Sequence, residues 1–175
     1  MIKRYSRKEL TDIWSEENKY KIWLEVEIAA AEAMEKYKII PRGVASIVKK
    51  KGKIKVKRIH DIEAKVKHDV IAFLTSITEQ TGIKARYLHQ GMTSSDVLDT
   101  SFNIQLVQSG NILLKNLDKI LNVLKRQAKK YKMTPCIGRS HGIHAEPITF
   151  GLKLLSFYEE FKRNKKRLKN AIEEI

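Results

Sequence analysis

Residues 96–131 read DVLDTSFNIQLVQSGNILLKNLDKILNVLKRQAKKY, and this stretch indicates the fold class. It contains no proline and a single glycine, Gly110, and its apolar residues recur with near-heptad spacing from Leu98 to Leu124. A helix of about 36 residues would be about 54 Å long at 1.5 Å per residue. A small domain cannot bury a helix of that length, so the pattern predicts one rod of an extended helical bundle.

The stretches on either side also carry helical patterns. Ser15 is expected to cap a helix whose buried stripe runs over Tyr20–Met34 and which ends before Pro41. Further periodic stretches cover residues 59–77 and 148–175. Only three prolines and eight glycines occur, and long stretches rich in Ala, Leu, Ile, Glu and Lys run without a break, so the sequence predicts an all-α protein.

Two domains are expected within this all-α chain. Residues 1–92 would form a small N-terminal helical domain, and residues 93–175 the first long helices of a helical bundle. The helix from about Ile148 should lie antiparallel to the one that starts near Asp96. Because the chain stops at Ile175 without a capping or turn residue, we expect the bundle domain to be truncated.

The composition favours a soluble globular protein, with 42% hydrophobic and 31% charged residues. The net charge of +15 lies largely in lysine runs, which we interpret as solvated helix faces and, over residues 49–57, a mobile loop. They lack interleaved aromatic residues, so we predict no nucleic-acid partner. An anionic small molecule would be equally attracted by this charge.

Cysteine usage and hydropathy indicate the compartment. Cys136 is the only cysteine, which excludes an intramolecular disulfide. The N-terminus has no apolar signal-peptide core, and no apolar run approaches the length of a membrane span. We therefore predict a cytoplasmic protein without a membrane partner.

The densest group of reactive side chains is Gly138–Pro147, which reads GRSHGIHAEP. It follows one helical pattern and precedes another, and its glycines permit backbone conformations closed to other residues. A histidine in such a segment could reach a ligand and titrate near neutral pH. Equally, the segment could be a polar turn whose histidines only satisfy nearby carbonyl groups.

Two more polar segments stand out. Lys67-His68-Asp69 interrupts a helical pattern, as an exposed helical corner or as a break between helices. Residues 87–96 carry His89 and then Thr93 and Ser94, which are natural N-caps for the long helix. The N-terminus of a helix favours anions.

Together these segments resemble the adenylosuccinate lyase family, within the fumarase/aspartase superfamily. The matching segments are Lys67–Val70, Gly91–Thr100 and Gly138–Pro147, and the N-terminal segments Ile2–Ser6 and Ile22–Glu27 are also similar. The resemblance covers all 175 residues without an insertion. The HGIHAEP sequence that begins at His141 is similar to this family and not to fumarase or argininosuccinate lyase.

The resemblance implies a carbon–nitrogen lyase of purine biosynthesis. Such an enzyme releases fumarate by β-elimination from adenylosuccinate, which gives AMP, and from the succinylated aminoimidazole carboxamide ribotide. The reaction needs a base that removes a proton from carbon and an acid that protonates the departing nitrogen. No metal or organic cofactor is implied. The family forms homotetramers in which three subunits contribute to each active site.

Catalytic and binding roles follow from the same resemblance. His141 would transfer a proton, as the acid on the leaving amine, and His68 would assist it. The implied substrate-binding residues are Arg4, Tyr5, Lys67, His68, Asp69, His89, Thr93 and Ser94. A guanidinium and a phenol at the first two positions suit a nucleotide phosphate. The hydroxyls of the last two match those that bind the succinyl carboxylates.

Two departures qualify the resemblance. Lys67 stands where the family usually has arginine, so a point charge replaces a two-pronged donor. The serine loop of the family, Ser-Ser-x-Met-Pro-x-Lys-x-Asn, which is held to supply the base, is not found in these 175 residues. The sequence therefore resembles about the first two-fifths of such an enzyme, and we expect it to be inactive alone.

Three alternatives remain open. The chain could belong to another lyase of the superfamily. Cys136, His141 and His144 could bind a metal, but no fourth ligand follows at a recognisable spacing, so we predict none. A non-catalytic, basic helical module that binds a polyanion would keep the apolar stripes but would not need His68, Thr93 and His141 to converge.

Overall fold

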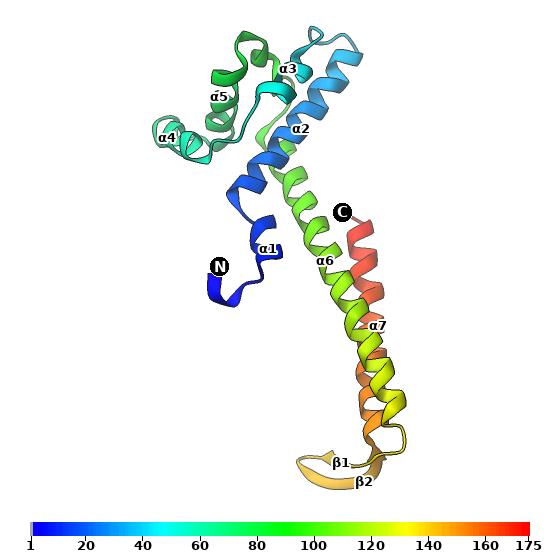
Figure 1. Cartoon of the computed structure of the whole chain (residues 1–175). Helices are drawn as coiled ribbons and strands as arrows, with labels where there is room; N and C mark the ends of the chain where they lie inside the picture. Colours follow the sequence, from blue (N-terminus) through cyan, green and yellow to red (C-terminus); the bar gives the residue numbers. More distant parts are fainter. Residues whose placement is uncertain (1) are drawn as a thin grey trace. The chain divides into compact units, whose positions relative to one another are not determined.

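The computed structural model describes residues 2–175, and they are mostly helical (Figure 1). In chain order the elements are η1 (Lys3–Tyr5), α1 (Lys8–Ile13), α2 (Glu16–Lys36), α3 (Val44–Lys51), α4 (Val56–Val66), α5 (Asp69–Thr81), η2 (Ile83–Tyr87), α6 (Ser94–Lys130), β1 (Pro135–Ser140), β2 (Ile143–Thr149) and α7 (Phe150–Glu173). The predicted helical fold class is confirmed. The short hairpin β1–β2 was not anticipated.

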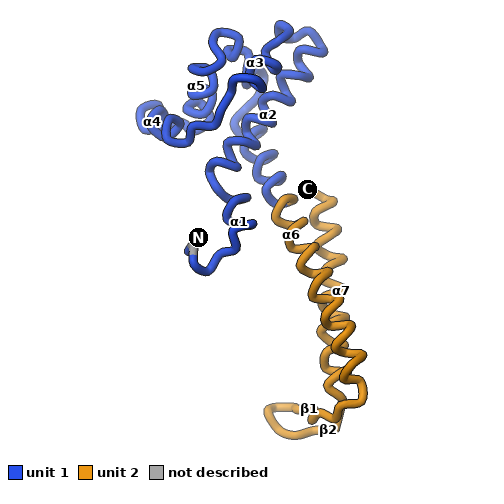
Figure 2. The backbone as a smooth tube through the Cα atoms, in the orientation of Figure 1, with its two compact units in different colours: residues 1–106 blue, residues 107–175 orange. Residues whose placement is uncertain are grey.

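The chain divides into two compact units inside α6 (Figure 2). The first unit ends at Leu106 and the second covers Val107–Ile175. The domain boundary predicted between residues 92 and 93 lies just before the start of α6 and stays a prediction.

An aromatic cluster forms the centre of the first unit. Tyr20 and Trp23 of α2 and Phe73 of α5 are buried. The ring of Phe73 stacks on Tyr20 at 5.9 Å and meets Trp23 edge-on at 5.5 Å, distances typical of favourable aromatic pairs. The predicted buried stripe of α2 is therefore confirmed, and it packs on α5. Burial, reinforced by the charge of Glu16, raises the pKa of Tyr20 to about 12, so its hydroxyl stays protonated.

Both ends of α2 have clear local causes. The hydroxyl of Ser15 accepts a hydrogen bond from the Asn18 N–H, which confirms the predicted N-cap. At the other end, Ile39 N–H donates to the Met34 carbonyl and Lys38 N–H to the Glu35 carbonyl. This is a Schellman motif with Lys38 in the left-handed conformation, φ 60°. It ends the helix before Pro41 is reached.

The lysine-rich segment differs from its prediction as a mobile loop. Lys49, Lys50 and Lys51 form the last turn of α3, where cations suit the helix dipole. Only residues 52–55 connect this helix to α4. The apolar face of α3, with Val44 and Val48 fully buried, holds the segment against the core.

The second unit is a helical hairpin closed by β1 and β2. α7 returns along α6, as the sequence predicted: Ile172 contacts Gly110, and Gly151 contacts Ala128. The Gly151 N–H donates to the Tyr131 carbonyl at 2.9 Å where the two helices meet the strands. The aromatic rings of Tyr131 and Phe150 pack there at 5.4 Å.

The segment expected to be an irregular inter-helix turn is a β-hairpin. β1 and β2 pair antiparallel from Pro135↔Thr149 to Ser140↔Ile143. Two residues, His141 and Gly142, join the strands, and both have positive φ, 52° and 76°. Positive φ at both central residues is what a type I′ turn requires, and its twist matches that of the strands.

Candidate active site

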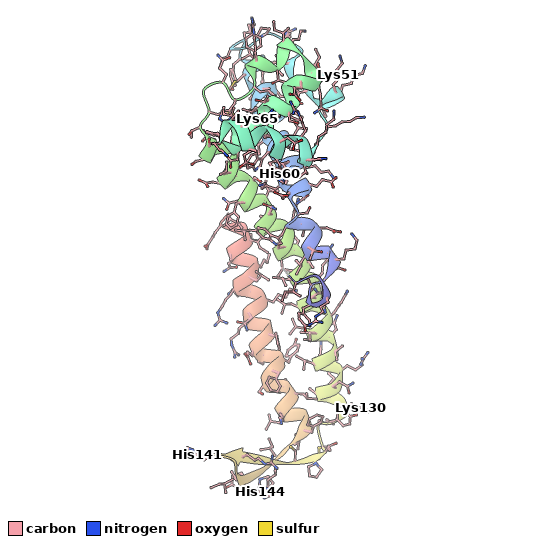
Figure 3. All side chains as sticks on the ribbon, turned by 90° about the vertical axis from the view of Figure 1, so that its left-hand side faces the viewer. Lys51, His60, Lys65, Lys130, His141 and His144 are labelled. Atoms are coloured by element: carbon pink, nitrogen blue, oxygen red, sulfur yellow. The ribbon has the colours of Figure 1, made fainter. Side chains whose placement is uncertain are left out.

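His141 occupies the tip of this hairpin. It is the first central residue of the turn, and its side chain is exposed. Figure 3 shows His141 and His144 at the free end of the strands, away from the helices of the unit. The imidazole is therefore displayed on an arm and is not enclosed by its own unit.

A β-bulge on β2, where Ala145 and Glu146 together oppose Gly138, sets the strand register behind that tip. The pairing shifts between Ile137 and Arg139, and Arg139 then pairs with His144. A Cβ on Gly138 would stand 2.6 Å from the Glu146 carbonyl oxygen, so the close strand approach requires glycine. The bulge decides which side chains of the arm share a face with His144.

The corner at Lys67, His68 and Asp69 is a break between two helices, one of the two interpretations that the sequence left open. Lys67 ends α4 in the left-handed conformation, φ 56°, and His68 is the N-cap of α5. The His68 Nδ1 accepts the Ile71 N–H at 3.4 Å and lies 3.5 Å from the Asp69 carboxylate. These contacts exclude each other, because Nδ1 accepts only when unprotonated and pairs with a carboxylate only when protonated. When His68 caps α5 through Nδ1, its neutral ring carries the proton on Nε2.

Thr93 and Ser94 begin the long helix. α6 starts at Ser94, and the Thr93 N–H donates to the Asp96 carboxylate at 2.8 Å, one half of a capping box. The predicted capping position is confirmed. Asp96 already supplies negative charge to this helix N-terminus, so an anion that binds there would have to rely on the hydroxyls and on nearby cations.

His89 is held by a residue that the sequence analysis did not single out. Glu27 of α2 is buried, and its two oxygens accept the His89 N–H at 2.8 Å and contact the His89 Nδ1 at 2.7 Å. The sequence does contain a signal for this contact. Position 27 lies in the apolar stripe of α2, three residues after Leu24 and four after Trp23. A charged residue inside a buried stripe indicates a buried polar contact.

Arg4 and Tyr5 lie next to each other in η1. The Arg4 guanidinium is 4.7 Å from the centre of the Tyr5 ring, within cation–π range. Both side chains are exposed, so both remain accessible to a ligand.

The candidate residues are distributed over both units. His68 meets Asp69, Arg4 meets Tyr5, and His89 meets Glu27, all in the first unit, whereas His141 belongs to the second. Among residues 2–175, no three His, Cys, Asp or Glu side chains lie close enough together to hold a metal ion. The alternative ligand set of Cys136, His141 and His144 therefore does not form in this chain.

A family model described as Lyase matches residues 3–175. The chain belongs to this lyase family. Adenylosuccinate lyase of Thermotoga maritima is 49% identical over 175 residues, which are 100% of this chain and 41% of that protein. Adenylosuccinate lyase of Bacillus subtilis is 44% identical over 171 residues, 98% of this chain and 40% of that protein.

Solved structures share the fold of this chain. A fumarate lyase from Mesorhizobium sp. BNC1 has a TM-score of 0.89 at 24% identity, over 95% of this chain and 40% of that one. A beta-carboxy-cis,cis-muconate cycloisomerase from Acinetobacter calcoaceticus sp. ADP1 has a TM-score of 0.86 at 27% identity, with the same coverage. The chain thus spans about two-fifths of the length of the curated relatives it matches.

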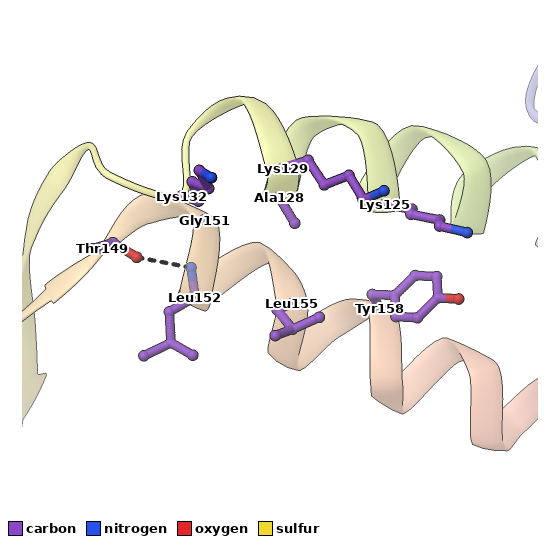
Figure 4. A pocket seen from close by; sticks show the side chains of 9 residues that line it. All are labelled: Lys125, Ala128, Lys129, Lys132, Thr149, Gly151, Leu152, Leu155 and Tyr158. Atoms are coloured by element: carbon purple, nitrogen blue, oxygen red, sulfur yellow. Dashed lines mark hydrogen bonds between the residues drawn. The ribbon is translucent and has the colours of Figure 1, made fainter.

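The second unit of this lyase-family chain also carries an uncovered apolar groove (Figure 4). Its volume is about 460 Å³, and it is lined by Lys125, Ala128, Lys129, Lys132, Thr149, Gly151, Leu152, Leu155 and Tyr158. Leu152 and Leu155 are exposed, as expected for a bundle helix without all its neighbours.

None of the helices in residues 2–175 is long and apolar enough to cross a membrane.

Proposed function

We propose that this chain is the N-terminal part of an adenylosuccinate lyase, which eliminates fumarate from adenylosuccinate to leave AMP. The observation that carries the proposal is the 49% identity with the Thermotoga maritima enzyme over the whole chain. The succinylated aminoimidazole carboxamide ribotide would be a second substrate of the same reaction. The enzyme would act in the cytoplasm, without a metal or organic cofactor.

His141 is the proposed acid that protonates the departing nitrogen. Its place at an exposed hairpin tip supports this role, because such an arm can enter a site formed by other subunits. A homotetramer whose sites combine residues of several subunits would bring His141 to the substrate of a neighbour. His68 is proposed to assist, with its Nε2 turned to the substrate while Nδ1 caps α5.

The first unit is proposed to hold the anionic groups of the substrate. Thr93 and Ser94, at the start of α6, offer hydroxyls to the succinyl carboxylates. Arg4 and Tyr5 offer a cation and a phenol to the phosphate.

Three residues complete the proposed binding set. Lys67 is a point charge at the corner before α5, and Asp69 is proposed to pair with the imidazole of His68 when that ring is protonated and no longer caps α5. His89 contributes the ring that Glu27 holds. The base is proposed to come from a serine loop outside these 175 residues, so the chain alone should not turn over adenylosuccinate.

A chimera tests the proposal. This chain would replace the matching 41% of the Thermotoga maritima enzyme, and fumarate release from adenylosuccinate would be followed by absorbance. We expect turnover within about tenfold of the parent enzyme, while the 175-residue chain alone shows none. A matched chimera that carries the Bacillus subtilis segment controls for the effect of the junction. A folded, tetrameric chimera without turnover, beside an active control, would overturn the proposal.

A further inference from the structure

Glu27 and His89 form a largely buried polar pair in the first unit. The Glu27 side chain has no exposed surface, and that of His89 is 17% exposed. One carboxylate oxygen accepts the His89 backbone N–H at 2.8 Å, and the other lies 2.7 Å from the ring Nδ1. A single side chain of α2 thus fixes the backbone and the ring of a residue 62 positions away.

His89 is also fixed on its carbonyl side. Its φ is 62°, a left-handed conformation that is unfavourable for a residue with a Cβ. The His89 carbonyl accepts the Met92 N–H at 3.3 Å, which closes the turn that leads directly into Thr93 and the start of α6. The position of the imidazole is therefore coupled to the N-terminus of the long helix.

The contact between the Glu27 carboxylate and the His89 ring is not needed to close this turn. The bond to the backbone N–H alone would satisfy that donor, and a neutral amide could form it without the cost of burying a charge. The bond to Nδ1 has a different effect: a carboxylate can only accept, so Nδ1 must carry a proton. Nε2 is then the ring nitrogen that Glu27 does not engage.

We propose that Glu27 is a positioning residue for His89: it engages Nδ1 as a donor, and the doubly protonated ring then presents its Nε2–H to an anionic oxygen of the substrate beside Thr93. The inference rests on the proposed function, because it assumes that the segment from His89 to Ser94 binds substrate. The oxygen belongs to a phosphate or a carboxylate. Nε2 donates to either when the ring is protonated.

Substitution of Glu27 by glutamine distinguishes two roles of Glu27: positioning the His89 ring, and only closing the turn through the His89 backbone N–H. Gln has the same shape, and its carbonyl oxygen can still accept the His89 N–H. Its NH2 group then faces Nδ1 and can only donate, so Nδ1 must become an acceptor and the neutral ring must move its proton to Nε2. A turn-closing role would survive this change, whereas a positioning role would not.

The ring state can be measured on the 175-residue chain itself. Imidazole nitrogen NMR of the chain should show His89 with a protonated Nδ1, and Glu27→Gln should remove that state with helix content unchanged by circular dichroism. Glu25→Gln, on the exposed face of the same helix, is the matched control and should leave the His89 spectrum unaltered. An unprotonated Nδ1 in the wild-type chain, or the same His89 tautomer in both Glu27 forms, would overturn the inference.

The chimera provides the functional readout. In Glu27→Gln the neutral ring can still donate from Nε2, but this bond is no longer charge-assisted, so the KM for adenylosuccinate should rise about tenfold, with a smaller change in kcat. In a His89→Ala background the same substitution should have no further effect on KM, because Glu27 acts through that ring. An equal effect of Glu27→Gln in both backgrounds contradicts the inference. If Glu27→Gln does not fold, Glu27→Asp, which keeps the charge but shortens the reach, replaces it in the KM measurement, and a protonated Nδ1 in the wild-type chain is then the NMR criterion.

The two proposals fail in different ways. An inactive chimera refutes the lyase function while the NMR experiment still decides how Glu27 holds the ring. An active chimera whose KM is insensitive to Glu27→Gln refutes the positioning role and leaves the lyase function standing.

Discussion

Gly151 lies against Ala128 so closely that a Cβ on Gly151 would stand 2.5 Å from the Ala128 carbonyl oxygen. The same Cβ would be 2.6 Å from the Lys132 Cα, so only backbone surrounds it. Backbone atoms of two packed helices can move apart only if the helix packing is disturbed. We therefore expect Gly151→Ala to destabilise the chain by about 2–3 kcal/mol. Chemical unfolding followed by circular dichroism measures the difference.

Gly110 is the matched control for this prediction. A Cβ there would meet the end of the Ile172 side chain, at 2.5 Å from Cδ1, and a side-chain end can rotate away. Alanine also gains about 1 kcal/mol of helix propensity over glycine. Gly110→Ala should therefore stay within about 1 kcal/mol of wild type. Equal losses for the two variants would show that the backbone contact of Gly151 does not matter.

Lys38 offers a stabilising substitution. It occupies the left-handed position of the Schellman motif after α2, where glycine is favoured, and its side chain is exposed. Lys38→Gly should raise the free energy of unfolding by about 1 kcal/mol. Lys36→Gly, inside the last helical turn, should lower it by about 0.5–1 kcal/mol. A loss of stability at both positions would contradict the capping explanation.

Glu35 gives stability a pH dependence. Its carboxylate accepts the Ala45 N–H at 2.7 Å, and this bond, with those of Gly43 and Val44 and the charge of Lys84, holds the pKa of Glu35 below its ordinary 4.5. A lowered folded pKa stabilises the fold fully above the unfolded value, and this stabilisation is lost as the pH falls through the folded one.

Glu35→Gln should therefore be less stable than wild type at pH 7, by about 0.5–1 kcal/mol, the low end for a side-chain cap because water screens this site. The difference should shrink as the pH falls below about 4. Thermal unfolding between pH 2.5 and 7 tests this, with Glu32→Gln on the same helix as control. A difference that stays constant over this range would refute the charge-dependent cap.

His141→Asn separates the turn from the chemistry. Asparagine tolerates positive φ well, and Asn-Gly is a preferred pair in type I′ turns, so the hairpin should persist. Cross-strand NMR contacts between Ser140 and Ile143 should remain. In the chimera, however, turnover should fall at least about a hundredfold, because the acid is lost. His60→Asn, a surface change in the first unit, should keep turnover near that of the parent chimera. Normal turnover of His141→Asn would exclude His141 as the acid.

The uncovered groove of the second unit predicts self-association. Leu152 and Leu155 leave apolar area in water, which costs about 25 cal/mol per Å², so we expect the 175-residue chain to assemble at micromolar concentration. Sedimentation equilibrium should show species larger than a monomer, and Leu152→Gln with Leu155→Gln should shift them toward monomer. Lys153→Gln, between the two, is the control. A monodisperse wild-type monomer would contradict the prediction.

The helices were predictable because their signals are local. The apolar stripe from Tyr20 and the Ser15 cap each depend on residues within a few positions of one another, and both were confirmed. For Lys67–Asp69 the sequence left two interpretations open, and the structure has the break. The start of α6 at Ser94 follows from the same kind of signal.

The hairpin and the Glu27–His89 pair were missed for different physical reasons. His-Gly is a weak type I′ signal, and the glycine and proline inside the strands, Gly138 and Pro147, disguise the period-2 pattern. The pair joins residues 62 positions apart, so only the folded chain brings them together. Glu27 was quoted within a matching segment, yet nothing local revealed its partner.

The bulge on β2 opposite Gly138 makes the hairpin arm intolerant of a change in length. Removing one residue from either strand would shift His141 off the turn and move every later side chain of that strand to the opposite face. Natural variation in this arm should therefore replace residues and conserve their number between Pro135 and Thr149. Insertions and deletions would instead accumulate in exposed connections such as the one after α2, where no register has to be kept.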